Sequence, residues 1–330
     1  MPISSNASYK PPFWQFNAHI QTIYPSLMRK VKVNYKRERV DLPDGDFLDL
    51  DWSYCKGKSE IRSSKLVIVT HGLEGDSTRH YVTGMVKKFN DLGFDGLGWN
   101  CRSCSGEMNR LPRFYHHGDV DDIRFVVNYA ISKGYKEVVL VGFSMGGSMT
   151  LRLLGDKPDT VPNEVKLGVA VSVPLDLFTS VFELYKKGRR FYMKRFIDKL
   201  GKKIKAKTEI FPNHPIINAD GYEKITNFEE FDNRYTAPLF GFKDAHDFYK
   251  KAGAKPFLKY IQKPTFIFQA INDPFLSPEC FELGEASDNK NVHLELIAQG
   301  GHVGFMMPNS KETYIENRVA EICKTTFQVV

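Results

Sequence analysis

The sequence predicts an α/β fold built on a mostly parallel sheet, with an antiparallel hairpin at its start and a helical cap inserted late in the chain. Short apolar runs rich in β-branched residues, typical of strands buried on both faces, alternate with stretches of helical periodicity. Asp44-Gly45 lies between two strand-like runs and is a strong hairpin signal. The alternation stops from 176 to 240, where helical stretches, prolines and aromatic residues occur without a strand. We therefore expect residues 1–175 and 241–330 to form the core and residues 176–240 to form the cap.

The individual elements are predicted in chain order. Residues 11–29 are aromatic and interrupted by prolines, and we expect an irregular arm lying on the domain rather than a helix. Strands are expected at 37–42, 47–53, 65–70, 94–99, 138–141, 165–173, 264–270 and 292–297. Helices are expected at 81–92, 119–133 and 310–326, and directly after the strand at 138–141. Because strands alternate with helices after the hairpin, most of the sheet should be parallel.

The composition limits the class of protein. The chain has 330 residues, of which 42% are hydrophobic and 26% charged, and this balance is typical of a globular protein with a substantial core. No apolar run approaches the roughly 18 residues that cross a bilayer, and residues 1–10 lack the apolar stretch of a signal peptide. We therefore expect a soluble, cytoplasmic protein. Five cysteines do not indicate a disulfide scaffold, and a net charge of +7 is only weak support for an anionic partner.

A nucleophile motif lies at residues 142–146, where Gly-Phe-Ser-Met-Gly fits the pattern G-x-S-x-G. An apolar run precedes it and a helical pattern follows, so the serine would lie on a sharp strand-to-helix turn. A free serine hydroxyl is a poor nucleophile and must be exposed beside a base. We predict Ser144 as the nucleophile and the Met145 amide, at the helix N-terminus, as one donor to an oxyanion. The alternative is a Gly/Ser turn in another α/β fold, since the motif also occurs by chance.

The serine needs a base, and the base needs an acid that orients it. When the serine lies on such a strand-to-helix turn, the acid follows it in the chain and the histidine follows the acid. His302 lies in a glycine-rich loop after the last strand, whereas His293 lies within that strand, so we predict His302 as the base. Asp273 follows the strand at 264–270 and is the predicted acid. Asp176, which follows the preceding strand, is the alternative.

A second oxyanion donor is expected in the loop after the strand at 65–70, which reads His-Gly-Leu-Glu-Gly at 71–75. The Leu73 backbone amide is the predicted donor, because a loop at this place in the chain supplies the second N–H beside a nucleophile of this kind. We interpret His71 as a structural residue that shapes the loop and not as a proton carrier.

Together these motifs resemble the YheT-like branch of the α/β-hydrolases over nearly the whole chain. The matching stretches are Phe-Asn-Ala-His-Ile-Gln-Thr-Ile-Tyr-Pro (16–25), His-Gly-Leu-Glu-Gly (71–75), Cys-Ser-Gly-Glu-Met-Asn-Arg (104–110), Gly-Phe-Ser-Met-Gly-Gly (142–147), Phe-Asp-Asn-Arg-Tyr-Thr-Ala-Pro-Leu-Phe-Gly-Phe (231–242) and Ala-Ile-Asn-Asp-Pro-Phe (270–275). The resemblance implies an α/β-hydrolase fold, the triad Ser144, Asp273 and His302, and hydrolysis of carboxylic esters, with lipids as substrates in some relatives. Ser103 departs from the pattern, because relatives usually carry glycine there, and the loop over the site is where we expect a difference.

Two further patterns are interpreted as structural. Residues 101–104 form a lone C-x-x-C, and a redox or zinc role would need a helix N-terminus or a second cysteine pair. The pairs His116–Asp121 and His117–Asp122 have the H-x₄-D spacing that serves proton abstraction in some acyltransferases. We favour a helix start rich in acids, which suits the positive end of the helix dipole.

The segment 186–207 is strongly basic. It holds eleven Lys and Arg and one acid, a charge of +10, in a chain whose net charge is +7. Apolar residues recur at helical steps from Val181 to Phe196, which predicts an amphipathic helix. We favour a cap helix with a solvated charged face, and the alternative is peripheral contact with an anionic membrane. We find no nucleic-acid recognition motif and expect no nucleic-acid partner.

The predicted function is hydrolysis of small-molecule or lipid-derived carboxylic esters through an acyl-enzyme on Ser144, without a cofactor or metal. One alternative is an alcohol acyltransferase that uses the same acyl-enzyme. The other is a ligand-binding protein that keeps the fold but has lost turnover.

Overall fold

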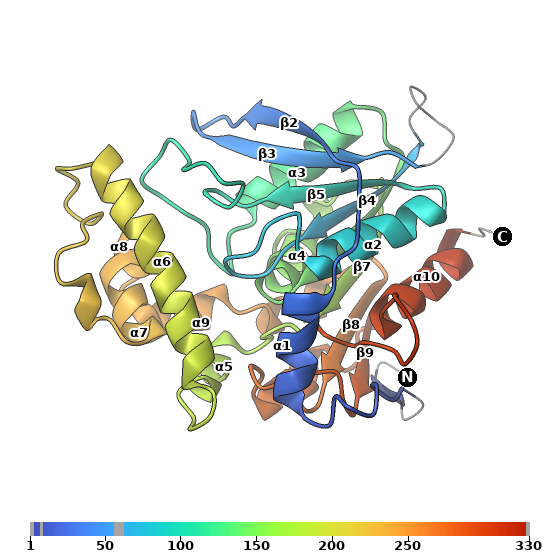
Figure 1. Ribbon diagram of the computed structural model, residues 1–330. Helices are drawn as coiled ribbons and strands as arrows, with labels where there is room; N and C mark the ends of the chain where they lie inside the picture. The colour runs from blue at the N-terminus through green and yellow to red at the C-terminus, as the bar shows by residue number, and fades with distance from the viewer. Residues whose placement is uncertain (1–2, 7–8, 56–62, 328–330) are drawn as a thin grey trace.

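A computed structural model describes residues 3–6, 9–55 and 63–327, and within them one nine-stranded sheet forms the centre of the molecule (Figure 1). The strands are β1 (Ile3–Asn6), β2 (Lys36–Asp41), β3 (Phe47–Ser53), β4 (Lys65–Thr70), β5 (Asp95–Asn100), β6 (Glu137–Phe143), β7 (Val165–Val171), β8 (Thr265–Ala270) and β9 (Val292–Ile297). Their order is β1-β9-β8-β7-β6-β4-β5-β3-β2. The pairs β2–β3 and β3–β5 are antiparallel and every other pair is parallel, so the predicted architecture is confirmed. β1, which pairs with β9, was not predicted, because its sequence Ile-Ser-Ser-Asn has no apolar alternation.

The hairpin turn lies where the sequence predicts it, with Gly45 at φ +87°. β3 is buried along its whole length although it contains two aspartates. Arg37 and Arg39 on β2 reach across to Asp51 and Asp49, each with a 2.8 Å N···O contact. These cross-strand pairs let acidic residues occupy a buried strand.

Two layers of helices cover the sheet, and α10 and α2 lie on the opposite side from α3 and α4 (Figure 1). Their bounds are α2 (His80–Asp91), α3 (Asp121–Ser132), α4 (Met145–Asp156) and α10 (Tyr314–Phe327). Alternate residues of β4 pack against the two helix layers. Leu66 and Ile68 belong to the cluster that includes α3 and α4. Val67 and Val69 belong to the cluster that includes α2 and α10. The apolar run of this strand is therefore explained by burial on both faces.

The prediction of an irregular arm at 11–29 is wrong, because α1 (Ala18–Met28) occupies most of it. Asn17 caps the helix, since its side chain accepts a hydrogen bond from the Ile20 amide. Pro25 lies inside the helix and removes one donor without ending it. The buried residues of α1 are Gln21, Thr22 and Pro25, so the helix lacks the apolar stripe that would have predicted it.

The cap contains α5 (Leu177–Glu183), α6 (Arg190–Ile210), α7 (Phe228–Phe231), a π-helical turn (Asp232–Thr236) and α8 (Ala237–Phe240), and it lies to the left of the sheet in Figure 1. α9 (Ala245–Ala252) adds Phe248 and Tyr249 to the same hydrophobic cluster, and the boundary at 240 stays a prediction. The predicted continuous helix from Val181 to Phe196 is wrong, because Gly188 at φ +88° lies in a break between α5 and α6. Short 3₁₀ segments are Pro158–Thr160, Tyr222–Lys224, Lys255–Tyr260, Pro278–Phe281 and Gly284–Ala286.

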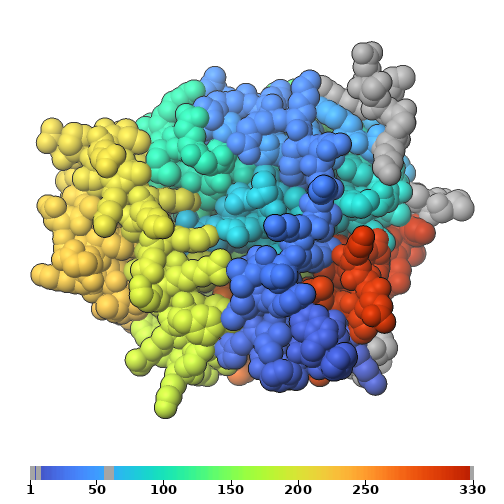
Figure 2. Space-filling view, viewed as in Figure 1, coloured from blue at the N-terminus to red at the C-terminus, as the bar shows by residue number. Residues whose placement is uncertain are grey.

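Among the described residues, no helix combines the length and the apolar character needed to span a membrane. On the face shown in Figure 2, the N-terminal segment and the first part of α6 lie side by side. Their contact is direct, since a ring nitrogen of His19 lies 3.1 Å from the Tyr192 hydroxyl.

Candidate active site

Ser144 occupies the sharp turn between β6 and α4, with φ +54°, in the left-handed region. The turn needs glycine on both sides. A Cβ on Gly142 would lie 2.2 Å from the Gly146 carbonyl oxygen, and a Cβ on Gly146 would lie 2.4 Å from the Thr70 carbonyl oxygen. The G-x-S-x-G pattern is thus a packing requirement that lets α4 begin directly against the end of β4.

The structure brings the three predicted side chains into one hydrogen-bonded chain. His302 Nε2 lies 2.9 Å from Ser144 Oγ, and His302 Nδ1 lies 2.8 Å from Asp273 Oδ2. The Phe275 amide donates to the other carboxylate oxygen at 2.8 Å, and the Phe275 ring stacks on the imidazole at a centroid distance of 4.1 Å. A carboxylate bound at Nδ1 favours the tautomer in which Nε2 accepts the serine proton.

α1 supports the loop that carries His302. The Thr22 hydroxyl accepts a hydrogen bond from the His302 amide at 2.9 Å, and Gln21 Oε1 accepts one from the Gly300 amide at 2.9 Å. A Cβ on Gly301 would lie 2.7 Å from Thr22 Oγ1, which explains the glycine beside the histidine. Sequence reasoning missed this support, although the motif at 16–25 and the Asn17 cap were signals of it.

The loop with the predicted second oxyanion donor lies against the nucleophile. A Cβ on Gly72 would come within 3.1 Å of Ser144 Cβ, and Leu73 lines the same cavity as Ser144. Met145 is the first residue of α4, where the amides of the first turn have no partner within the helix. The structural role expected for His71 is confirmed, because its Nδ1 bonds the Gly72 carbonyl at 2.7 Å and its Nε2 accepts from the Cys101 amide at 3.1 Å.

The alternative candidates for catalytic residues make other contacts. Asp176 caps α5 by accepting from the Thr179 amide at 2.9 Å, and His293 stacks on Phe266. Asp122, the acid of one H-x₄-D pair, receives two hydrogen bonds from buried Arg102 at 2.7 and 2.8 Å. It is therefore part of a structural ion network.

Ser103 adopts φ +61°, which fits the glycine expected there from the resemblance. Its hydroxyl donates to Asn109 Oδ1 and accepts from the Asn109 amide at 3.1 Å. Serine is accommodated because these local bonds hold the loop in the left-handed conformation.

Comparison with known proteins identifies the family of the chain. The family model for the alpha/beta hydrolase fold matches residues 65–307. The chain is 33% identical to the "Putative esterase YheT" of Escherichia coli over 92% of this chain and 88% of that protein. The chain belongs to the α/β-hydrolase family, in its YheT-like branch.

Two further relatives and one solved structure are similar to the chain at lower identity. The human protein "Phospholipase ABHD3" is 27% identical over 91% of this chain and 74% of its own, and the Saccharomyces cerevisiae protein "Monoacylglycerol lipase" is 25% identical over 89% and 75%. The solved esterase Pf2001 of Pyrococcus furiosus superposes with a TM-score of 0.57 at 18% identity, over 89% of this chain and 93% of its own. This last likeness supports the fold alone.

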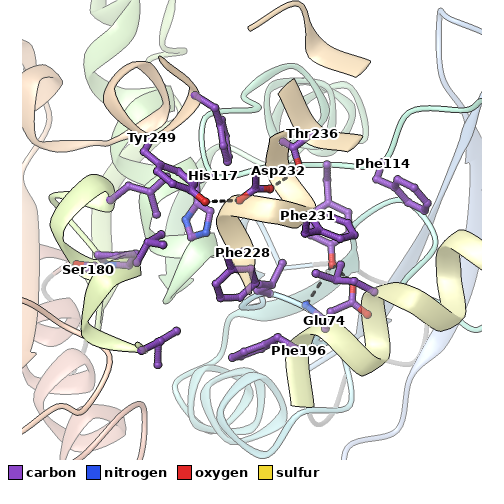
Figure 3. A pocket seen from close by; sticks show the side chains of 18 of the residues that line it. Glu74, Phe114, His117, Ser180, Phe196, Phe228, Phe231, Asp232, Thr236 and Tyr249 are labelled. Carbon is purple, nitrogen blue, oxygen red and sulfur yellow. Dashed lines mark hydrogen bonds between the residues drawn. The ribbon is translucent and has the colours of Figure 1, made fainter. Parts of the chain in front are cut away.

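An apolar cavity opens beside Ser144 in this hydrolase, between the core and the cap (Figure 3). Counted to its open mouth, it encloses about 1060 Å³. Aromatic side chains from several cap elements and from the core form most of its walls, among them Phe114, Phe196, Phe228, Phe231, Phe240, Phe248 and Phe275. A cavity of this kind suits an extended apolar group.

One buried carboxyl group lies in the wall of this cavity. Asp232 begins the π-helical turn and accepts hydrogen bonds from Thr236 Oγ1 at 2.5 Å and from the Tyr249 hydroxyl at 2.8 Å (Figure 3). Burial raises the pKa of Asp232 to about 7, although both hydrogen bonds act in the opposite direction. Burial likewise lowers the pKa of His117, on the same cavity, to about 3, so its imidazole is neutral. The sequence had no signal for Asp232, because a single aspartate in a cap motif carries no spacing information.

The raised pKa of Asp232 predicts a pH-dependent stability. Between about pH 4 and 7 the folded state holds a proton that the unfolded state has released, so stability should fall as pH rises through this range, by about 1.4 kcal/mol per unit at most. Asp232→Asn should remove this slope. Urea unfolding of both proteins from pH 4.5 to 7.5 should show the free energy of unfolding of the variant rising relative to wild type.

Asp220→Asn, at an exposed cap carboxylate, is the matched control. A constant difference between the Asp232 variant and wild type over this pH range would contradict the buried neutral carboxyl group.

Proposed function

We propose that this α/β-hydrolase cleaves carboxylic esters, including lipid-derived acyl esters, through an acyl-enzyme on Ser144. The observation that carries the proposal is the hydrogen-bonded chain Ser144–His302–Asp273, with contacts of 2.9 and 2.8 Å at the turn where the nucleophile of this fold lies. The names of the relatives, an esterase, a phospholipase and a monoacylglycerol lipase, support ester hydrolysis.

In the proposed mechanism each of these groups has one role. Ser144 Oγ attacks the ester carbonyl carbon while its proton passes to His302 Nε2. Asp273 accepts from Nδ1 and stabilises the imidazolium, and the amides of Leu73 and Met145 bind the oxyanion. His302 then gives the proton to the departing alcohol, which leaves the acyl group on Ser144. Finally His302 takes a proton from water, the hydroxide cleaves the acyl ester, and the serine is regenerated.

The apolar cavity indicates where the acyl chain lies. Ser144 and His302 line it together with the aromatic side chains of the cap. Burying an acyl chain there contributes about 0.8 kcal/mol for each methylene removed from water. A lipid-derived acyl group therefore fits this cavity better than a short polar acyl group does.

Ser144→Ala should abolish ester hydrolysis, lowering kcat by several orders of magnitude, because the nucleophile is removed. A p-nitrophenyl ester assay measures the loss, and a fluorophosphonate probe should label the wild type and leave the variant unlabelled. Thermal melting checks that the variant is folded. Substantial activity in pure variant protein would refute the assignment of Ser144.

Asp273→Asn should lower kcat on the order of 10³- to 10⁴-fold, because the amide stabilises the wrong imidazole tautomer. Asp176→Asn is the matched control and should cost far less, because asparagine still caps α5. The pH profile of the same ester assay distinguishes a change of tautomer from a folding defect. If Asp176→Asn lowered kcat more than Asp273→Asn, Asp176 would be the acid of the triad.

We further propose that the basic cap segment 186–207 touches anionic membranes. Not all of its charge is available, since Lys203 lies 2.7 Å from Glu74 Oε1 and Lys207 is buried against backbone carbonyls. The exposed basic residues are Lys186, Lys187, Arg190, Lys194, Arg195, Lys202 and Lys205. Two of them are paired with carboxylates, Lys186 with Glu183 at 2.6 Å and Lys194 with Asp198 at 2.8 Å. Phe191 on α6 is an exposed apolar side chain, and the N-terminal segment that contacts the start of α6 carries four more, at Phe13, Phe16, Leu27 and Met28. A basic surface with exposed apolar side chains is typical of peripheral membrane contact.

Replacing Lys187, Arg190, Lys202 and Lys205 with glutamine should weaken sedimentation with anionic vesicles. Each basic residue near an anionic surface contributes about 1 kcal/mol, and the effect should fade as salt shortens the Debye length. The control replaces four exposed lysines on the core, Lys157, Lys166, Lys290 and Lys324, which gives the same net charge. Equal sedimentation of wild type with neutral and anionic vesicles would leave the segment a solvated cap helix.

A further inference from the structure

A second cavity also reaches Ser144 and differs from the apolar one in its charge. It is bounded by α1, the loop after β4, the beginning of α2 and the middle of α6, and encloses about 770 Å³ counted to its open mouth. Ser144 and His302 line both cavities. The charged residues of the second cavity are Arg79, Arg195, Lys199 and Glu74.

The one carboxylate in this wall is already neutralised. Glu74 Oε1 accepts hydrogen bonds from the Tyr115 hydroxyl at 2.6 Å and from Lys203 Nζ at 2.7 Å. Lys203 does not line the second cavity, so the positive charge that matches Glu74 comes from outside it. The three cations of the wall are therefore not balanced by Glu74.

Two of these cations have no carboxylate within 4 Å among the described residues. Lys199 Nζ donates to the backbone carbonyl of Glu74 at 3.1 Å, and Arg195 is exposed at the mouth. Arg79 lies 3.7 Å from Asp76, a long contact at a partly exposed pair. Burial lowers the pKa of Lys199, and so do the positive charges of Arg79 and Arg195, while Glu74 and Asp76 act in the opposite direction. A cluster of cations that repel one another is stabilised by an anion placed between them.

The start of α2 adds two features that favour an anion. The helix has no side-chain cap at Arg79, so its first-turn amides present partial positive charge. His80, the first residue of α2, is 6% exposed and lines the cavity, yet neither of its ring nitrogens has a partner among the described residues. A neutral imidazole still carries one N–H, and burying that group without a partner costs free energy unless a ligand or water supplies one.

The two cavities would bind different parts of an ester. The acyl chain fits the aromatic cavity, which leaves the alcohol part for the cationic cavity, whose open mouth allows the alcohol to depart. The unmatched charge of Arg195 and Lys199, about +2, is opposite in sign and similar in size to the charge of about −1.5 to −2 that a phosphate monoester carries at pH 7. Guanidinium groups pair with phosphate oxygens in a planar, bidentate manner.

We propose that the cavity formed by Arg79, Arg195, Lys199 and the start of α2 binds the phosphate of a phosphorylated alcohol, so that acyl esters of such alcohols, for example acylglycerol phosphates, are preferred over the corresponding neutral esters. This inference rests on the proposed hydrolysis at Ser144 and adds the class of alcohol that leaves.

The test compares 1-octanoylglycerol 3-phosphate with 1-octanoylglycerol, which share one acyl chain, both as monomers in solution. Wild type should show a kcat/KM for the phosphorylated ester at least about tenfold above the neutral one. Arg195→Gln and Lys199→Gln should each lower this ratio by about tenfold, mainly through KM, and Lys199→Arg should restore most of it. Lys224→Gln and Lys243→Gln, at exposed lysines outside the cavity, should leave the ratio unchanged.

Inhibition by inorganic phosphate distinguishes a cavity that binds the phosphate of the ester from one that binds only free phosphate. Inorganic phosphate should inhibit wild type competitively against the phosphorylated ester and inhibit Lys199→Gln less. Inhibition by phosphate without any preference for the phosphorylated ester would overturn the proposal, and so would a ratio near one in wild type or a ratio insensitive to both variants. Hydrolysis of 1-octanoylglycerol by wild type, lost in Ser144→Ala, shows independently whether the proposed function holds.

Discussion

The hydrogen bond between His302 Nε2 and Ser144 Oγ joins residues 158 positions apart, and both lie in or beside backbone that is unfavourable for its side chains. Ser144 adopts φ +54°, and Val303 and Phe305, just after the histidine, adopt +53° and +47°. Left-handed conformations of non-glycine residues cost about 1 to 3 kcal/mol each, most for a β-branched residue. The site therefore exists only if the surrounding structure holds both turns in place.

The two turns are held by different means. At Ser144 the restraint is close packing of backbone, because Gly142 and Gly146 leave no room for a side chain. At His302 the restraint is a set of hydrogen bonds from α1, through Gln21 and Thr22. This explains why α1 buries polar rather than apolar residues: losing one partner would leave a buried loop amide unsatisfied, which costs about 1 to 3 kcal/mol. The N-terminal motif is thus part of the site's construction, although it lies far from Ser144 in sequence.

What could be predicted from the sequence follows from which interactions leave a periodic or local signal. The strands of the parallel sheet have apolar runs, and the elbow has a fixed spacing of glycines, so these elements and the positions of Ser144 and Asp273 could be predicted. α1 could not, because its buried face is polar and its partners lie near residue 300. The break at Gly188 was missed because the apolar spacing continues through it. Asp232 and the unmatched Lys199 acquire their properties only from tertiary neighbours, which no local pattern encodes.

The cap is also connected to the loop that carries the predicted oxyanion donor. Glu74 follows Leu73 and adopts φ +55°, in the left-handed region. From α6, Lys203 binds the Glu74 carboxylate and Lys199 binds its backbone carbonyl. The residue that follows Leu73 is therefore held partly by a cap helix. Lys203 and Ile204 also line the aromatic cavity. One cap helix thus contacts both the aromatic cavity and the loop after β4, and it reaches that loop through two lysines.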